Sequence, residues 1–370
     1  MGGQRVSRRL FCEGAAISLI APAVEGCGQA RGPALPGSRF FVFGEGDRQK
    51  LLYRQGVLSD LKTGDIVWRR PVSGERFCAS ETAVDVTTDG KPLRIREDEA
   101  GVWLGNELIA FGTKINRPRF EGMRHAARLR ALHHELLVNI VDGAPVPNLF
   151  VYGRPWRRDA AMMAMCLART GNLHLIKDWI LGLDTVFDGN AGVEEPDNIG
   201  QTMYLLALAK APARHPLIAR ALAEAARLRE RDHISGSTDG SVHAAYQTLW
   251  LKHGLGALGL PDNFEVPWAL DHYRSLVWWM PKGGVPYPTR FRDRARSDYP
   301  YLAWAEAHYW NLDPPTLPDA DSFPQTWEAN AAAVDYTKMD AAGQDWARAR
   351  VAGPHGWHAA EAFLYLEKQG

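Results

Sequence analysis

Hydrophobic residues in the first third of the chain recur in short runs that are typical of β-strands. Between residues 39 and 111 they stand in small groups or alternate with polar residues, and turn sequences rich in Gly and Asp separate them. This pattern predicts a small antiparallel sheet of five or six strands, in a β-rich domain at residues 38–115. The clearest runs are Phe40–Phe43, Leu51–Tyr53, Ile66–Trp68, Ala83–Val86 and Leu93–Ile95.

From residue 121 onward the hydrophobic spacing becomes that of α-helices. Leu129, Leu132, Leu136 and Ile140 recur every three or four residues and predict an amphipathic helix that ends at Asp142-Gly143. Further helices are predicted from their spacing, with Pro near several starts and Gly near several ends. They span residues 156–170, 173–184, 198–210, 216–230, 241–258, 267–280, 298–310, 324–340 and 355–369.

Successive helices that are joined by short loops predict antiparallel helical hairpins. The spacing shows no solenoid repeat. We therefore expect a mainly α fold, in which residues 121–370 form an α/α toroid of helical hairpins behind the small antiparallel β-rich domain.

Composition and charge exclude several classes of protein. The 43 Lys and Arg balance 43 Asp and Glu, whereas a nucleic-acid binder needs a surplus of cations, so nucleic acid is not an expected partner. A membrane span is not expected either, because no run of about 18 apolar residues occurs. The 13 Trp are many for 370 residues, and Trp favours places where one edge is packed and the other meets a partner.

The first 30 residues resemble an export signal. Ser7-Arg8-Arg9-Leu10-Phe11 resembles the twin-arginine motif, and a short weakly apolar stretch and Ala21-Pro22-Ala23 follow it. We therefore expect residues 1–30 to be a signal peptide and the protein to be periplasmic or otherwise extracytoplasmic. Val24-Glu25-Gly26-Cys27 also resembles a lipoprotein box, which makes Cys27 a candidate lipid anchor.

Metal, redox and nucleotide templates fail in this sequence. The body holds two cysteines, Cys78 and Cys166, which we expect as buried thiols, with a disulfide between them as the alternative. His134-Glu135 lacks the second His of HExxH, and no P-loop or G-x-S-x-G is present. We expect neither a metal nor a cofactor.

Two segments place charged residues at predicted helix starts. Trp156, Arg158 and Asp159 open a nearly apolar helix, so they would face a cavity; the alternative is an Asp favoured by the helix N-terminus and paired with Arg. Glu194 and Glu195 stand just before a helix for which Asp197 is an N-cap candidate. Two neighbouring carboxyls can raise one another's pKa, as a general acid requires, whereas a solvated loop is the plain alternative.

Other candidate residues are polar or aromatic and lie at later helices. His243 and Gln247 share a helix face, where a satisfied core histidine is the alternative. Sugar rings stack on aromatic side chains and bond to carboxylates, so the set is typical of a glycan site. The remaining members are Asp239, Asp298, Tyr301, Trp304, Glu306, Trp327 and Trp357.

Trp156-Arg157-Arg158-Asp159-Ala160 resembles the W-x-R-D-[AS] segment of the six-hairpin glycosidases, the glucoamylase and trehalase group. The resemblance implies that Arg158 and Asp159 hold hydroxyls of the released sugar. Val193-Glu194-Glu195 is similar to the family's W-E-E segment, which implies Glu194 as general acid and Glu195 as substrate-binding partner. The base would lie near the C-terminus, where Glu306, Asp298 and Glu361 compete.

We accordingly expect an exported carbohydrate-active protein, a glycoside hydrolase with a carboxylate pair acting on an oligo- or polysaccharide. Inversion would need the two carboxyls about 6.5–9.5 Å apart. One alternative is a polysaccharide lyase with His243 or Tyr246 as base, which the balanced charge disfavours. The other is a non-catalytic glycan-binding or cell-envelope protein.

Overall fold

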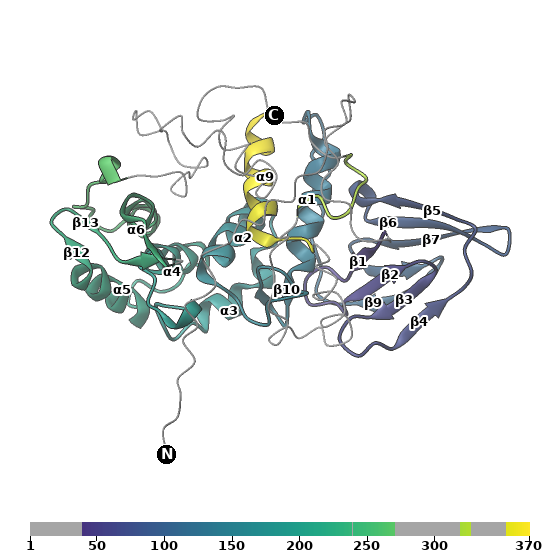
Figure 1. The fold of residues 1–370 in the computed structure, drawn as a ribbon, viewed down its shortest axis with the longest axis horizontal. Helices are drawn as coiled ribbons and strands as arrows, with labels where there is room; N and C mark the ends of the chain where they lie inside the picture. The colour runs from purple at the N-terminus through teal and green to yellow at the C-terminus, as the bar shows by residue number, and fades with distance from the viewer. Residues whose placement is uncertain (1–38, 239, 271–318, 327–352) are drawn as a thin grey trace, which may run out of the picture.

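The computed structural model describes residues 39–238, 240–270, 319–326 and 353–370. Strands gather at one end of the molecule, and the helices lie beside them and at the other end (Figure 1). Of the described residues, 37% are helical and 21% lie in strands of five antiparallel sheets, so the fold is mixed α/β. The expectation of a mainly α protein built as an α/α toroid is therefore wrong.

Two antiparallel sheets form the N-terminal part, and each strand pairs with its neighbour in sequence. The first has the order β1-β2-β3-β4 and the second β5-β6-β7-β8-β9. Phe41 and Tyr53 of the first sheet pack with Val84 and Ile95 of the second in one core, so the sheets form a sandwich. The strands are β1 Phe41–Phe43, β2 Leu51–Arg54, β3 Val57–Asp60, β4 Ile66–Arg69, β5 Gly74–Cys78, β6 Ala83–Thr88, β7 Lys91–Glu97, β8 Gly101–Leu104 and β9 Glu107–Phe111.

The described part of the chain after residue 121 contains seven α-helices. Most of the helices predicted there are present with nearly the predicted bounds, because their apolar stripes are long and regular. They are α1 Ala126–Val138, α2 Arg157–Arg169, α3 Lys177–Leu181, α4 Asp197–Leu208, α5 Pro216–Arg227, α6 Ala244–Leu258 and α9 Gly356–Lys368.

Strand content explains why the fold class was wrong. Three short hairpins interrupt the helical part, and the first turns at Asp142-Gly143, where both φ angles are positive, at 51° and 73°. The helix predicted over residues 173–184 is instead the 3₁₀ turn Leu173–Leu175 followed by the short α3. The hairpins are β10 Ile140–Val141 with β11 Ala144–Pro145, β12 Arg229–Glu230 with β13 His233–Ile234, and β14 Ser237–Thr238 with β15 Ser241–Val242.

Predicted helices near the C-terminus fall largely outside the described residues. The helix predicted at 298–310 lies wholly outside them. Of the helices predicted at 267–280 and 324–340, only the first residues are described, including a 3₁₀ turn at Trp268–Leu270.

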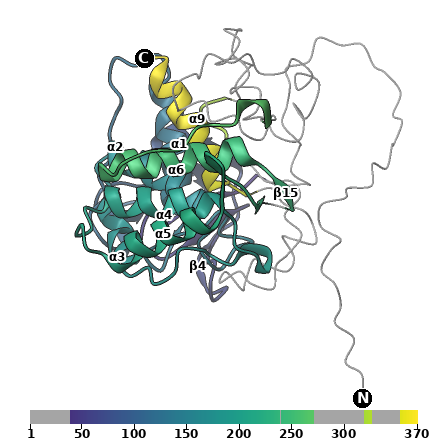
Figure 2. The same cartoon turned by 90° about the vertical axis from the view of Figure 1, so that its left-hand side faces the viewer.

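The helices pack in a row in which α4 lies between α2 and α6, and α9 lies between α1 and α2 (Figures 1 and 2). Helices α4 and α6 cross where Gly200 faces Gly254: a Cβ at Gly200 would lie 2.1 Å from the carbonyl carbon of Trp250, and one at Gly254 would lie 2.5 Å from the Gly200 carbonyl oxygen. The two backbones touch, which only glycine allows.

A second core joins the strands to the helical part. Phe40 and Leu52 of the N-terminal part pack with Val138 and Val141 around the end of α1, and all four are buried. The N-terminal strands therefore share an apolar core with α1 and pack against it.

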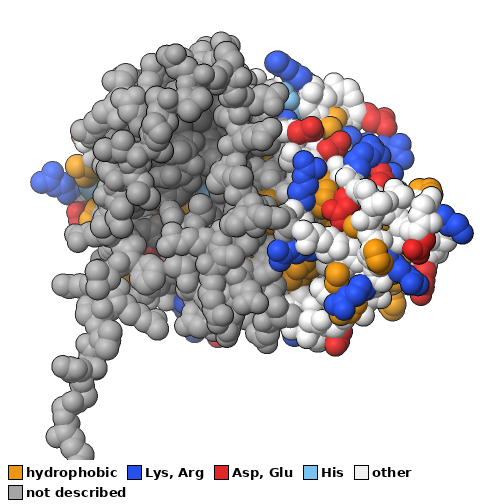
Figure 3. Space-filling model, turned by 45° about the vertical axis from the view of Figure 1, so that its right-hand side comes forward, with side chains coloured by type: hydrophobic (Ala, Val, Ile, Leu, Met, Phe, Trp, Pro, Cys, Tyr) orange, Lys and Arg blue, Asp and Glu red, His pale blue; other side chains and the backbone are white. Residues whose placement is uncertain are grey.

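Over the described strands, charged side chains of both signs are interspersed on the surface (Figure 3). Among the described residues, none of the helices is both long and apolar enough to cross a membrane. Cys78 and Cys166 are buried free thiols, so the alternative of a disulfide between them does not hold.

Candidate functional site

A set of buried charged side chains lies where α2, α4 and α9 begin. Arg158 and Asp159 belong to the first turn of α2, Glu195 precedes α4, and Trp357 and Glu361 are on α9. The four charged residues are buried and Trp357 is partly buried. We call these five residues the carboxyl cluster.

Arg158 holds this cluster together. Its Nη2 lies 3.7 Å from Glu195 Oε2, and its guanidinium carbon lies 4.9 Å from the centre of a Trp357 ring. A planar guanidinium can pair with a carboxylate and stack on an aromatic face at once. Arg158 thus connects the start of α4 to the start of α9.

Glu361 is the carboxyl of the cluster with the most perturbed environment. Burial, opposed by the Trp357 indole N–H and assisted by the nearby Asp159 carboxylate, raises the pKa of Glu361 to about 8. The indole approaches without well-formed hydrogen-bond geometry, since neither Trp357 Nε1 nor Glu361 Oε2 has a hydrogen-bond partner among the described residues. With a pKa of about 8, Glu361 is mostly protonated at neutral pH.

Two histidines border the cluster at the start of α9. His355 is the N-cap of α9, and its Nδ1 accepts the backbone N–H of His358 at 3.4 Å. Its Nε2 lies 3.8 Å from Asp159 Oδ1. Burial, and then the charges of His358 and Arg158, lower the pKa of His355 well below its ordinary value, so the ring is neutral.

A second polar group joins α4 to α6 and is held by hydrogen bonds. Asp197 Oδ1 accepts the Thr238 hydroxyl at 2.8 Å, and Asp197 Oδ2 accepts Gln201 Nε2 at 2.9 Å. Gln247 Nε2 donates to Thr238 Oγ1 at 2.9 Å. Asp197 thus lies in the first turn of α4 rather than at its N-cap, and Thr238 of β14 links it to Gln247 of α6. His243 is buried at the start of α6.

The structure places the remaining candidate residues in different parts of the molecule. Glu194 is exposed and pairs with Arg227 at 2.6 Å, so the structure does not bring it to the carboxyl cluster. Trp156 is the N-cap of α2 and packs on Tyr152, with ring centres 4.7 Å apart. Outside the described residues lie Asp239, Asp298, Tyr301, Trp304, Glu306 and Trp327.

Glu135 was not among the sequence candidates, although it is fully buried. Its carboxyl accepts the backbone N–H of Gln325, the backbone N–H of Thr326 at 3.1 Å and the Thr326 hydroxyl at 2.6 Å. Burial raises the pKa of Glu135 to about 8, and these bonds oppose the shift. The only sequence signal was a Glu inside the apolar face of a helix, and its partners are 190 and 191 residues away.

Glu45, Glu97 and His134 place one ligand atom each within 4.8 Å of one another, as a metal site would. Glu97 Oε1 already accepts the backbone N–H of Glu45 at 2.7 Å and Arg48 Nη1 at 2.9 Å. His134 Nδ1 lies 2.9 Å from Glu45 Oε1, and its Nε2 lies 2.9 Å from a backbone carbonyl oxygen. Arg48 pairs with Glu97, and Arg117 Nη2 lies 3.4 Å from Glu45 Oε1, so arginines neutralise both carboxylates and we interpret these residues as a buried ion-pair network.

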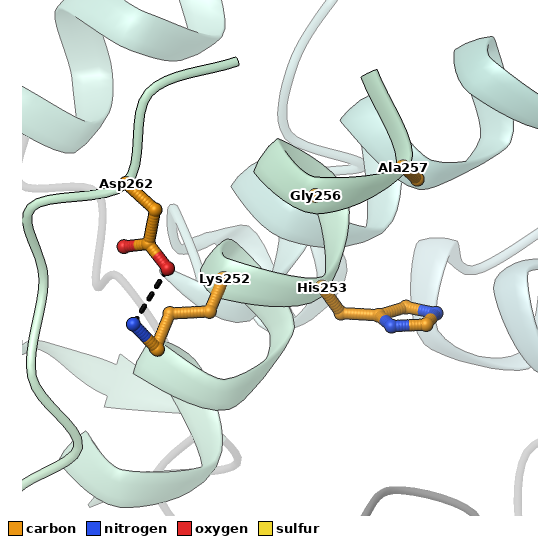
Figure 4. Close-up of a pocket in the computed structure, with 5 residues that line it drawn as sticks. All are labelled: Lys252, His253, Gly256, Ala257 and Asp262. Carbon is orange, nitrogen blue, oxygen red and sulfur yellow. Dashed lines mark hydrogen bonds and ion pairs between the residues drawn. The ribbon is translucent and has the colours of Figure 1, made fainter. Parts of the chain in front are cut away.

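A hollow of about 440 Å³ lies at the last turns of α6 (Figure 4). Lys252 crosses it to form an ion pair with Asp262 at 2.6 Å, and Gly256 and Ala257 form part of its wall. His253 also lines the hollow, and burial lowers its pKa to about 4. None of its lining residues belongs to the carboxyl cluster, and we assign it no role in the chemistry.

Comparison with known proteins identifies no relative: no protein-family model, curated protein or solved structure matches the chain.

Proposed function

We propose that the protein is a carbohydrate-active enzyme, a glycoside hydrolase whose reaction takes place at the carboxyl cluster. The observation that carries the proposal is the group of buried carboxyls, Glu361, Asp159 and Glu195, gathered around Arg158 and Trp357; burial also raises the pKa of Glu361. Two carboxyls held in different protonation states are the means by which glycosidases supply an acid and a base. The resemblance to the six-hairpin glycosidases is confined to the segment from Trp156 to Ala160. Its Arg158 and Asp159 lie in the carboxyl cluster, whereas the fold is not the toroid of that family and Glu194 lies outside the cluster.

In this mechanism Glu361 is the general acid. It donates its proton to the glycosidic oxygen, and the bond from that oxygen to the anomeric carbon breaks. Glu195, whose carboxylate is paired with Arg158, takes a proton from a water molecule whose oxygen attacks the anomeric carbon. Asp159 raises the pKa of Glu361 and accepts hydrogen bonds from sugar hydroxyls, and Trp156 and Trp357 provide aromatic surface.

The test is hydrolysis of a broad panel of oligo- and polysaccharides, followed as new reducing ends. Glu361→Gln should lower kcat by about 10²–10⁴-fold, the usual contribution of a general acid. The matched control is Glu367→Gln on the same helix, where an exposed ion pair with Arg169 is lost and activity should be kept. Glu194→Gln separates the two assignments, because the family resemblance names Glu194 as the acid and the geometry names Glu361.

Other outcomes would favour the other functions. Unsaturated products in place of simple hydrolysis would indicate a lyase. No product, together with a glycan that raises the Tm, would indicate a binding protein. Full activity of Glu361→Gln would refute the assignment of the acid.

A further inference from the structure

Thr326 joins α1 to the start of α9. Its hydroxyl donates to Glu135 of α1 and accepts the backbone N–H of His355 at 3.3 Å; the same hydroxyl also lies 3.4 Å from the His355 carbonyl oxygen. His355 is the residue that caps α9. A single buried hydroxyl therefore bridges the Glu135 carboxyl to the cap of the helix that carries Trp357 and Glu361.

Both ends of this bridge are fixed. Glu135 is buried in the last turn of α1, and α1 packs directly on α9. The carboxyl also accepts the backbone N–H groups of Gln325 and Thr326, so it holds the short segment in place by three bonds. Asn139, one turn further along α1, donates to the carbonyl of Pro354 at 3.0 Å. Residues of α1 and its C-cap Asn139 therefore hydrogen-bond both to residues 325–326 and to the segment just before α9.

From this geometry we infer that Glu135 is a positioning residue, which fixes the first turns of α9 through Thr326 and so places the Glu361 carboxyl against Asp159 and Trp357. The inference rests on the proposed function for its catalytic consequence. A buried carboxyl with three donors from one short segment is more than helix packing requires, because an apolar side chain would fill the same space without desolvation of a carboxyl.

The inference is tested with Thr326→Val, which removes the hydroxyl, and Thr326→Ser, which keeps it. In Thr326→Val kcat should fall about tenfold or more with KM little changed, since displacement of a catalytic group by about 1 Å can cost 10²-fold. The alkaline limb of the pH profile, which Glu361 sets, should move as well. Thr326→Ser should restore both. Glu135→Gln should behave like Thr326→Val if it folds.

Hydrogen exchange of the backbone amides at residues 357–361 gives a readout that needs no activity. Thr326→Val should speed exchange there, and Thr326→Ser should not. As a control, Val84→Ala lowers stability in the N-terminal sandwich, and at equal loss of Tm it should leave α9 exchange and the pH profile unchanged.

The two hypotheses fail separately. If the wild-type protein cleaves nothing but exchange at α9 responds as expected, the hydrolase proposal fails and the positioning role of Glu135 stands on structure. If Thr326→Val leaves α9 exchange, kcat and the pH profile at wild-type values, the positioning role is refuted whatever the substrate. A Val84→Ala variant that moves the pH profile equally would refute it too, because the effect would then be general destabilisation.

Discussion

Replacing Gly200 by alanine should separate α4 from α6. The new Cβ would lie 2.1 Å from the Trp250 carbonyl carbon and oxygen and 2.4 Å from the Leu251 nitrogen. Non-bonded heavy atoms prefer about 3.5 Å, so the helices would have to move apart by more than ~1 Å. All of these atoms are backbone, so no side-chain rotation can relieve the contact.

The loss of stability can be estimated from these terms. Overpacking a core costs about 1–3 kcal/mol, and occasionally more, while alanine gains about 1 kcal/mol over glycine in a helix. Because the clash involves two helix backbones, we take the upper end of the overpacking cost and expect a net loss of about 2 kcal/mol for Gly200→Ala.

Gly256→Ala is the matched control, because it is also in α6 and its Cβ would meet nothing within 4 Å. There only the helix propensity changes, so the variant should gain up to about 1 kcal/mol. Urea unfolding followed by circular dichroism at 222 nm measures both variants, with equal m-values expected. If Gly200→Ala is as stable as wild type, or as stable as Gly256→Ala, the account of the helix crossing is refuted.

Three further predictions concern charged side chains. The folded-state pKa of Glu361 is raised from 4.5 to about 8, so its contribution to stability is full below pH 4.5 and is lost as pH rises to about 8. In urea unfolding between pH 5 and 8, Glu361→Gln should make the fall of stability with pH shallower, and the part due to Glu135, whose pKa is raised equally, should remain. An unchanged slope would count against the raised pKa of Glu361. Arg48→Met leaves the buried Glu97 carboxylate without its ion-pair partner and should lower the free energy of unfolding by about 3–5 kcal/mol in the same assay. The control Arg76→Met removes an exposed ion pair and should cost under about 0.5 kcal/mol. Equal losses of stability in the two variants would contradict the buried network. Arg8→Lys with Arg9→Lys should keep a reporter fused to residues 1–30 inside the cell, and continued export would refute the twin-arginine assignment.

Helix positions could be predicted from the sequence better than fold class. The stripe from Leu129 to Leu136 repeats over several turns, and such a pattern admits one explanation. The Asp142-Gly143 pair gave the same local signal as a helix end, because residues that adopt positive φ can either end a helix or form the turn of a β-hairpin. Only tertiary contact distinguishes the two, and short hairpins of this kind turned an expected all-helical region into a mixed one.

The candidate site shows the same limit. Arg158 and Asp159 stood out because charge at the start of an apolar helix needs an explanation, and both lie in the carboxyl cluster. Glu194 and Glu195 are neighbours in sequence with the same side chain, yet one pairs with Arg227 at the surface and the other is buried beside Arg158. Sequence cannot separate them, because the direction of each side chain is set by the chain turn at the start of α4.

The bond between Glu135 and residues 325–326 also bears on the order in which the chain can fold during synthesis. Helix α1 leaves the ribosome nearly 200 residues before residues 325–326, so the Glu135 carboxyl and the face of α1 that receives α9 stay exposed to water while that part of the chain is made. Loop closure over that distance is slow compared with local pairing of the N-terminal strands. The sandwich should therefore form early, while the surface that receives α9 waits for the end of the chain. A ribosome-bound intermediate with a finished sandwich and an open helical half is thus the expected target for chaperones.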